Sequence, residues 1–205
     1  MHPWIAEALD VLWPVQCAAC STPATSLCDN CLSGWEPRTL DVRGIPLTVL
    51  GDYEGGLRDT VLACKEHGDS SVVGKIAARL APVCPDATAA VIVPPSASGL
   101  RKRGFHAVDW LARGIARKRG MRTLRLRFDT APRKEQKTRN LERRVTADRS
   151  MRLRSRLAGE RVVIIDDVVT TGTTALAAVR AVRDAGGTVA GFLAIAHTPR
   201  RTGLG

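Results

Sequence analysis

Aromatic side chains are scarce in this chain of 205 residues, making up 4% of the composition, with four tryptophans, three phenylalanines and one tyrosine. Aliphatic side chains must therefore fill most of any core. No apolar run approaches the roughly 18 residues that a membrane-spanning helix needs, and the N-terminus lacks the basic start and long apolar stretch of a signal peptide. We therefore expect no membrane span, no secretion by that route and a cytoplasmic location.

Acidic residues are scarce in one particular segment. Residues 101–160 hold 20 basic and 6 acidic residues, whereas the remaining 145 hold 11 and 14, so one segment carries the whole excess behind the net charge of +11. Arginine outnumbers lysine 25 to 6, which suits forked contacts with phosphate oxygens, although GC-rich coding would give the same bias. The segment favours a polyanionic partner, either nucleic acid or a phosphate-dense substrate, and a solvated basic face is the alternative.

Hydrophobic periodicity divides the chain into a small module, residues 1–43, and a larger domain, residues 44–205. Residues 2–13 predict a short amphipathic helix, and residues 32–44 resemble a linker. The strands predicted in the domain are 45–53, 89–93, 121–128, 162–165 and 188–196. The helices predicted there are 56–67, 70–83, 105–119 and one that ends near residue 183, while residues 130–157 predict a long loop or an exposed helix. This alternation predicts an α/β fold with a mostly parallel sheet flanked by helices.

The most informative stretch is VVIIDDVVTTGTT, residues 162–174. Its apolar run suits a central parallel strand, and two acids follow it at the edge where open α/β sheets bind ligands. The next residues form a turn that opens into a helix, whose N-terminal amides attract phosphate. The residues after the strand are Asp166, Asp167, Val168, Val169, Thr170, Thr171, Gly172, Thr173 and Thr174. The pattern predicts a sugar-phosphate site, with phosphate on the turn, and the acids either bind sugar hydroxyls or lie near Mg²⁺.

Four of the six cysteines are crowded into the pattern Cys-x2-Cys-x7-Cys-x2-Cys, formed by Cys17, Cys20, Cys28 and Cys31. Each close pair directs two thiolates toward one point, and four thiolates complete a closed tetrahedral Zn²⁺ site of the structural type. Disulfides or free thiols are the alternative. The isolated Cys64 and Cys84 are expected to be small buried hydrophobic residues.

Residues 162–174 resemble the 5-phosphoribosyl-1-diphosphate (PRPP) loop of type I phosphoribosyltransferases, which has an apolar strand, two acids and then Thr-Gly-x-Thr. Together with the cysteines, this loop makes the chain similar to the ComF family, competence-associated proteins that join an N-terminal zinc finger to a phosphoribosyltransferase-like domain. The likeness covers about 190 residues. The other residues that carry it are Tyr53, Gly55, Arg58, Lys65, residues 93–96, residues 103–105 and Gln136.

The resemblance implies a type I phosphoribosyltransferase-like domain that binds PRPP with Mg²⁺, and some members of the family are implicated in handling single-stranded DNA during uptake. It also implies that the backbone near Pro95 approaches the pyrophosphate and that cationic side chains neutralise it. The candidates on the pyrophosphate side are Lys65, Pro95, Ser96, Arg101, Lys102 and Arg103. From the residues alone, Lys65 is equally a solvated helix lysine, and residues 101–103 are equally a charged loop.

Three interpretations follow. The first is a PRPP-binding phosphoribosyltransferase-like protein that serves DNA uptake or nucleotide metabolism. The second is a single-stranded nucleic-acid-binding protein with a catalytically silent transferase fold, and the third is an adaptor that docks on a helicase-like partner through the zinc module and residues 2–13. The chain has His106 and Ala107 where the family commonly has Asn-Gln, which leaves the acceptor open.

Overall fold

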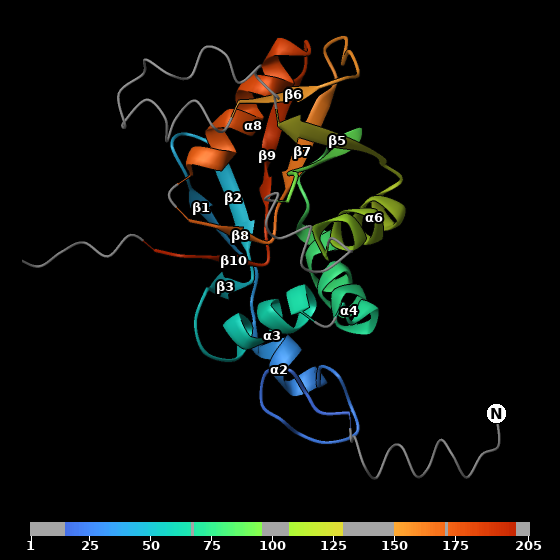
Figure 1. Cartoon of the computed structure of the whole chain (residues 1–205), viewed down its shortest axis with the longest axis vertical. Helices are drawn as coiled ribbons and strands as arrows, with labels where there is room; N and C mark the ends of the chain where they lie inside the picture. Colours follow the sequence, from blue (N-terminus) through green and yellow to red (C-terminus); the bar gives the residue numbers. More distant parts are fainter. Residues whose placement is uncertain (1–14, 67, 96–106, 129–149, 171, 200–205) are drawn as a thin grey trace, which may run out of the picture.

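The computed structural model describes residues 15–66, 68–95, 107–128, 150–170 and 172–199, and its centre is a seven-stranded sheet (Figure 1). In spatial order its strands are β1 (Arg38–Asp41), β2 (Pro46–Val49), β9 (Thr188–Leu193), β7 (Arg161–Ile165), β4 (Ala89–Ile92), β5 (Arg122–Phe128) and β6 (Met151–Leu153). The five inner strands run parallel, while β1 and β6 pair antiparallel at the two edges. The predicted α/β class and mostly parallel sheet are confirmed.

Helices cover both faces of the sheet, so its central strand is buried on both sides. Val162 and Ile164 belong to the same core as α8 (Thr173–Asp184), whereas Val163 and Ile165 pack in the core formed with α3 (Gly55–Glu66), α4 (Ser70–Leu80) and α6 (Ala107–Arg119). These four side chains of β7 are fully inaccessible to solvent. The uninterrupted apolar run that predicted a central strand follows from this two-sided burial.

The predicted helices of the domain are present to within a few residues. The helix expected over 70–83 ends as an α-helix at Leu80 and continues as the 3-10 turn η1 (Ala81–Val83), because Pro82 lacks the N–H that another α-helical turn requires. The expected helix at 2–13 and most of the 130–157 segment lie outside the described residues. Within the described part of the chain, no helix has both the length and the apolar character needed to cross a membrane.

Two predicted strands are each divided between two sheets. Residues 45–53 form β2 and then β3 (Gly51–Asp52), and residues 188–196 form β9 and then reach β10 (Ala196–His197). Strands β3 and β10 join β8 (Val168–Val169) in a small parallel sheet of order β3-β10-β8. The two segments that cross from one sheet to the other run side by side, since the N–H of Leu50 donates to the carbonyl of Ile195 at 3.0 Å. The prediction of single continuous strands was wrong in this respect.

The prediction of a linker over residues 32–44 was also wrong. This segment contains the end of α2 (Asp29–Gly34) and the whole of β1, which forms a hairpin with β2 through the pairs Arg38–Val49 to Asp41–Pro46. Residues 151–153, expected in a loop or helix, instead form β6 on the opposite edge. Short edge strands with polar side chains lack the apolar alternation from which strands are predicted.

The cysteine-bearing segment packs against the helical side of the domain, next to α3 and α4 (Figure 1). Leu27 is fully buried in the same core as these helices. The Nζ of Lys75 on α4 donates to the carbonyl of Leu27 at 2.5 Å and lies 3.4 Å from the carboxylate of Asp29. The segment therefore shares its core with the larger domain.

Candidate functional site

The two acids that follow β7 are held by backbone hydrogen bonds at the carboxyl edge of the sheet. The Asp166 N–H donates to the carbonyl of Leu193 at 3.1 Å, and the Asp167 carbonyl accepts from the N–H of Ile195 at 3.0 Å. The Asp167 N–H donates to Oδ1 of Asp166 at 2.9 Å. Both acids therefore lie where open α/β sheets bind their ligands.

A lysine from another element completes this group. Lys65, in the last turn of α3, places its Nζ 2.9 Å from Oδ1 of Asp167, and both side chains are about four-fifths buried, with exposures of 23% and 21%. Burial, together with the negative charge of Asp167, raises the pKa of Asp166 to about 8. The site thus contains one ion pair and one carboxyl group that keeps its proton near neutral pH.

The glycine of the following turn has a backbone conformation that few other residues adopt. Gly172 has φ 76° and caps α8 at its N-terminus, and it is buried. The strand β8 connects the acids to this turn, and Thr173 and Thr174 form the first residues of the helix. Thr171 lies outside the described residues. The acids and the first amides of α8 therefore belong to one short connection at the same edge of the sheet.

The predicted pyrophosphate side is described only in part. Strand β4 pairs with β7 so that Ile92 lies opposite Ile165, and the Val93 N–H donates to the Ile165 carbonyl at 3.2 Å, which places Pro94 and Pro95 at the same edge as the acids. Lys65 reaches that edge from α3. Ser96, Arg101, Lys102 and Arg103 lie outside the described residues.

A cavity of about 190 Å³ opens beside this edge, between the ends of β4 and β5 and the first turns of α6. Its lining includes Pro94, Pro95 and Arg125 but neither acid. Arg125 in turn lies 2.7 Å from Asp109 of α6. The cavity therefore adjoins the acid pair through the end of β4 and does not enclose it.

Sequence reasoning missed the residues that cover the turn. A Cβ added to Gly172 would lie 2.9 Å from Cγ1 of Val42 and 3.6 Å from Nε of Arg43, both from the β1–β2 hairpin. The sequence signal for this hairpin is weak, because Gly44 suits the second position of a two-residue turn but Arg43 does not suit the first. The segment therefore resembles a linker as much as a hairpin.

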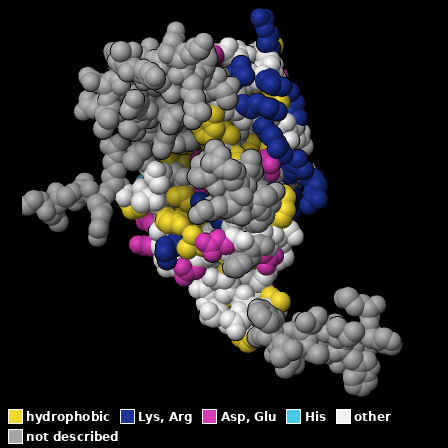
Figure 2. Space-filling model, in the orientation of Figure 1, with side chains coloured by type: hydrophobic (Ala, Val, Ile, Leu, Met, Phe, Trp, Pro, Cys, Tyr) yellow, Lys and Arg dark blue, Asp and Glu magenta, His cyan; other side chains and the backbone are white. Residues whose placement is uncertain are grey.

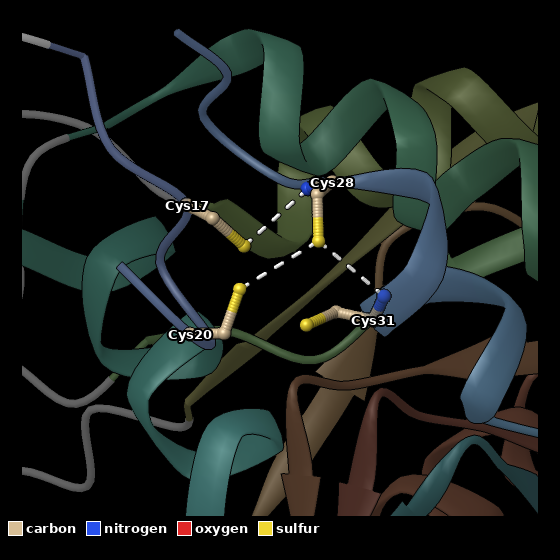
Figure 3. A group of neighbouring side chains, drawn as sticks. All are labelled: Cys17, Cys20, Cys28 and Cys31. Atoms are coloured by element: carbon tan, nitrogen blue, oxygen red, sulfur yellow. Dashed lines mark hydrogen bonds between the residues drawn. The ribbon is translucent and has the colours of Figure 1, made fainter. Parts of the chain in front are cut away.

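The four clustered cysteines converge on one point (Figure 3). Their Sγ atoms all lie within 4.8 Å of one another, and those of Cys20 and Cys28 are 3.7 Å apart. Tetrahedral zinc with Zn–S bonds of about 2.3 Å would require sulfur atoms about 3.8 Å apart. The group could therefore hold a metal ion such as zinc after only a small contraction.

Backbone amides prepare some of these thiols for ionisation. Burial opposes ionisation of the Cys17 thiol, but N–H groups including that of Cys28, 3.3 Å from the sulfur, lower its pKa to about 6. Cys28 caps α2, and its sulfur accepts from the Cys31 N–H at 3.4 Å. Amide donors of this kind are expected around thiolates that bind a metal.

The two isolated cysteines lie in the core, as predicted, with 0% of Cys64 and 5% of Cys84 exposed. Burial, assisted by the charges of Asp69 and Asp167, raises the pKa of Cys64 to about 12, and burial raises that of Cys84 to about 11. Both thiols therefore stay protonated at neutral pH.

Known proteins resemble parts of this chain. Orotate phosphoribosyltransferases of Mycobacterium leprae (strain TN) and Mycobacterium avium (strain 104) are each 43% identical to it over 63 residues, 31% of this chain and 31% of each relative. The matched region therefore spans about a third of the length of these curated relatives.

Solved structures of phosphoribosyltransferases also align with the chain. Adenine phosphoribosyltransferase from Thermoanaerobacter pseudethanolicus aligns with a TM-score of 0.44 and 15% identity over 78% of this chain and 95% of that one. Orotate phosphoribosyltransferase from Mycobacterium tuberculosis H37Rv, in complex with inorganic phosphate, aligns with a TM-score of 0.39 and 22% identity over 69% of this chain and 63% of that one. The family model of the phosphoribosyl transferase domain matches residues 71–204, which is more than half of the chain and includes β7, the acid pair and α8. The chain belongs to the phosphoribosyl transferase domain family.

Proposed function

We propose that this chain is a PRPP-binding protein of the ComF type, cytoplasmic and serving DNA uptake or nucleotide metabolism. One observation carries the proposal. The acid pair follows the carboxyl end of the central strand β7, and a short connection that ends in a turn with Gly172 at φ 76° leads from the acids to the first amides of α8. This arrangement lies inside the matched family region. The cysteine group N-terminal to it favours the ComF branch of the resemblance.

In the proposed complex, each part of PRPP meets a different part of the edge. Asp166 and Asp167 would accept hydrogen bonds from the ribose hydroxyls. Residues 170–174 would bind the 5′-phosphate through helix amides and threonine hydroxyls. The backbone at Pro95 and Ser96 would approach the pyrophosphate, and Lys65 with residues 101–103 would supply the positive charge that a departing pyrophosphate requires.

Mg²⁺ would be held by oxygen ligands, which the two carboxylates and the phosphate groups of PRPP supply. When bound, Mg²⁺ would neutralise the negative charge of the pyrophosphate. Because Lys65 already contacts Asp167, the cation and the lysine would compete for that carboxylate. We therefore assign Asp167 first to Lys65 and to the ribose, and assign Mg²⁺ mainly to the ligand's own phosphates.

The cysteine group is proposed to hold Zn²⁺ in a structural role. Four sulfur donors within 4.8 Å of one another leave no position for a catalytic water. The bound metal would fix the loops that pack on α3 and α4.

The expected division of the chain at residue 43 is better placed before Arg38, because β1 belongs to the main sheet.

Thermal denaturation tests the proposed binding. PRPP with Mg²⁺ at millimolar concentration should raise the Tm of the wild type by several degrees, because a ligand that binds only the native state stabilises it. The same ligand should have no effect on Asp166→Asn/Asp167→Asn, while Asp184→Asn, an exposed acid at the far end of α8, should respond like the wild type. An unchanged wild-type Tm would contradict the proposal.

Turnover needs its own experiment. In a transferase, an acceptor nucleophile would attack C1 of the ribose as pyrophosphate leaves with the bonding electron pair. Pyrophosphate release from PRPP and Mg²⁺ should therefore be measured with a panel that includes orotate, adenine and single-stranded DNA. Release with one acceptor would identify an enzyme, whereas binding without release across the panel would identify a PRPP sensor.

A second candidate function rests on the basic surface. Lys and Arg side chains gather along one side of the molecule, over the region of α6 and β5 (Figure 2). The exposed basic residues of these elements are Arg113, Arg117, Lys118, Arg119, Arg122, Arg125 and Arg127. Single-stranded DNA bound there by its phosphates would dissociate steeply with increasing salt and show little sequence preference. A flat salt response would count against this function.

The proposed helicase-like partner would dock on the cysteine segment and residues 2–13. The matching experiment removes residues 1–14 alone, because a deletion up to residue 42 would also remove the sheet strand β1. An adaptor role predicts that partner capture is lost while PRPP binding persists.

A further inference from the structure

Helix α3 lies between the cysteine segment and the small sheet β3-β10-β8 (Figure 1). At its first turn, a Cβ added to Gly56 would lie 2.9 Å from the carbonyl oxygen and 3.0 Å from the Cβ of Ala19, so the contact leaves no room for a side chain. Ala19 belongs to the turn between Cys17 and Cys20, the first pair of the cysteine group. The turn that carries two of the proposed metal ligands therefore rests on the start of α3.

The rest of α3 is held in the core. Leu57, Val61 and Cys64 are at most 3% exposed and line the buried face of the helix. They belong to the same core as Cys17 and Leu27 of the cysteine segment. A closely packed helix of 12 residues, roughly 18 Å long, moves as one body, so a displacement of its first turn also displaces its last turn.

The last turn of α3 supplies positive charge to the acid pair. The Nζ of Lys65 lies 2.9 Å from Oδ1 of Asp167, and both side chains are mostly buried. Among the described residues, Lys65 is the only cation in ion-pair contact with Asp166 or Asp167. Because the energy of a mostly buried ion pair depends strongly on its geometry, a displacement of this turn changes the charge that a ligand meets at the acids.

The first turn of the cysteine segment has a conformation that needs support. Backbone hydrogen bonds hold it, since the Cys17 N–H donates to the carbonyl of Thr22 and the Ser21 N–H to the carbonyl of Cys17, each at 2.8 Å. Ser21 nevertheless has φ 61° and Ala24 has φ 67°, values that residues other than glycine rarely adopt. Zinc bound by the four sulfur atoms would compensate for this cost, because metal binding contributes directly to the folding of small modules. Without the metal, we expect the turn to relax away from α3.

We propose that the metal-bound cysteine group is a positioning site for Lys65. Through α3 it holds the lysine at the acid pair, and it thereby couples metal binding to PRPP binding. This inference rests on the proposed function, since Lys65 acts on the PRPP that the acids bind. The coupling is reciprocal by linkage, so a metal that raises the affinity for PRPP by some factor has its own affinity raised by PRPP by the same factor. The metal therefore does more than stabilise the fold.

Chelator competition tests this coupling on the full-length protein. Zinc affinity should be measured with a colorimetric chelator for the wild type, Lys65→Gln and Lys118→Gln, an exposed lysine of α6 that serves as the control for charge. Each protein is titrated without ligand, with PRPP and with ribose 5-phosphate, at the same Mg²⁺ concentration throughout. Both ligands are used at the same multiple of their own Kd for that protein, determined by calorimetry, so that general stabilisation of the native state contributes equally. A titration without protein corrects for zinc held by the ligand.

In the wild type and in Lys118→Gln, PRPP should raise the affinity for zinc about fivefold or more, which is the usual range for coupled sites. Ribose 5-phosphate lacks the pyrophosphate that Lys65 is proposed to face, so it should change zinc affinity by less than about twofold. In Lys65→Gln, neither ligand should change zinc affinity by more than about twofold, because the residue that the metal positions is absent.

Equal increases with both ligands, or an undiminished increase with PRPP in Lys65→Gln, would overturn the proposal, because the metal would then act on the whole fold. Unchanged zinc affinity in a wild type that binds PRPP would also overturn it and would leave the proposed function standing. A folded wild type that binds no PRPP in the calorimeter would overturn the proposed function itself. A wild type that binds no zinc would overturn the assignment of the metal.

Discussion

Lys65 Nζ lies 2.9 Å from Oδ1 of Asp167, so the end of α3 is tied to the carboxyl edge of the central strand across 102 positions of sequence. The ion pair brings a cation to the acid pair before any ligand binds. At the other end of the same helix, Gly56 touches the cysteine segment, since a Cβ there would lie 2.9 Å from the carbonyl oxygen of Ala19. Helix α3 therefore links the cysteine group to the proposed PRPP site.

Replacing the lysine tests its proposed role at the pyrophosphate. Lys65→Gln removes the positive charge beside Asp167, and we expect PRPP affinity to fall about tenfold or more. The Tm should fall as well, because Asp167 would be left mostly buried without its cation, so the titration is made well below the Tm of the variant. Titration calorimetry gives the affinity, with Lys118→Gln on the exposed side of α6 as the control. Unchanged PRPP affinity in Lys65→Gln would exclude Lys65 from the site.

Removal of the metal should lower the thermal stability of the protein. Wild-type protein purified without chelator should contain about one zinc per chain, and the Cys20→Ser/Cys28→Ser variant should contain none. We expect this variant to lose roughly 10 °C in Tm, because structural zinc contributes directly to folding. Elemental analysis and thermal denaturation test this, with Cys84→Ala as a cysteine outside the cluster. Full zinc content in the double variant would refute the assignment of the ligands.

Two glycine substitutions should change stability in opposite directions. Gly56→Ala forces a methyl group against the Ala19 carbonyl and should destabilise the protein by about 1–2 kcal/mol. Gly74→Ala, on α4, meets nothing within 4 Å and should stabilise it by about 0.5–1 kcal/mol, because alanine is the better helix former. Denaturant titration of both variants gives these values. Equal effects of the two substitutions would mean that the cysteine segment does not rest on α3.

The buried acid predicts how stability depends on pH. Asp166 has a pKa of about 8 in the native state, far above the unfolded value near 3.9, so the native state retains a proton that the unfolded chain releases. The free energy of unfolding should therefore fall as pH rises from about 4 through 8. Asp166→Asn cannot ionise, so its Tm should rise relative to that of the wild type by roughly 10 °C between pH 5 and pH 8, since three pH units for one proton correspond to about 4 kcal/mol.

The measurement is the Tm of both proteins, free of ligand and Mg²⁺, at intervals between pH 5 and 8.5. Asp184→Asn should keep the pH dependence of the wild type, because Asp184 is exposed. A constant difference between wild type and Asp166→Asn at every pH would show that Asp166 ionises as an ordinary carboxyl group does.

Sequence reasoning found the parts of the site that are local in sequence. The strand, the acids and the glycine turn are contiguous in sequence. Because the strand is buried on both faces, residues 162–165 form an uninterrupted apolar run that can be recognised in the sequence. The four cysteines were equally local. Parts assembled by tertiary contact were not predictable in this way: nothing near Lys65 in the sequence indicates Asp167, and nothing near Arg43 indicates Gly172.

The errors in the fold have a related cause. The edge strands β1 and β6 are three or four residues long and mostly polar, and they exist because a neighbouring strand offers free hydrogen-bonding groups. Residues 45–53 and 188–196 were each predicted as one strand because apolar residues continue through the crossing from one sheet to the other. Hydrophobic patterning reports burial, and it does not report which partner a strand hydrogen-bonds.

The central claim is that one edge of the sheet binds PRPP through Asp166, Asp167 and the turn at Gly172. The most direct measurement is calorimetric titration of the full-length zinc-bound protein with PRPP and Mg²⁺, alongside Asp166→Asn/Asp167→Asn. We predict one binding site per chain in the wild type and an affinity at least about 100-fold weaker in the double variant, since several charge-assisted hydrogen bonds are lost. Equal heats and equal affinity in the two proteins, or no binding to the folded wild type, would contradict the account.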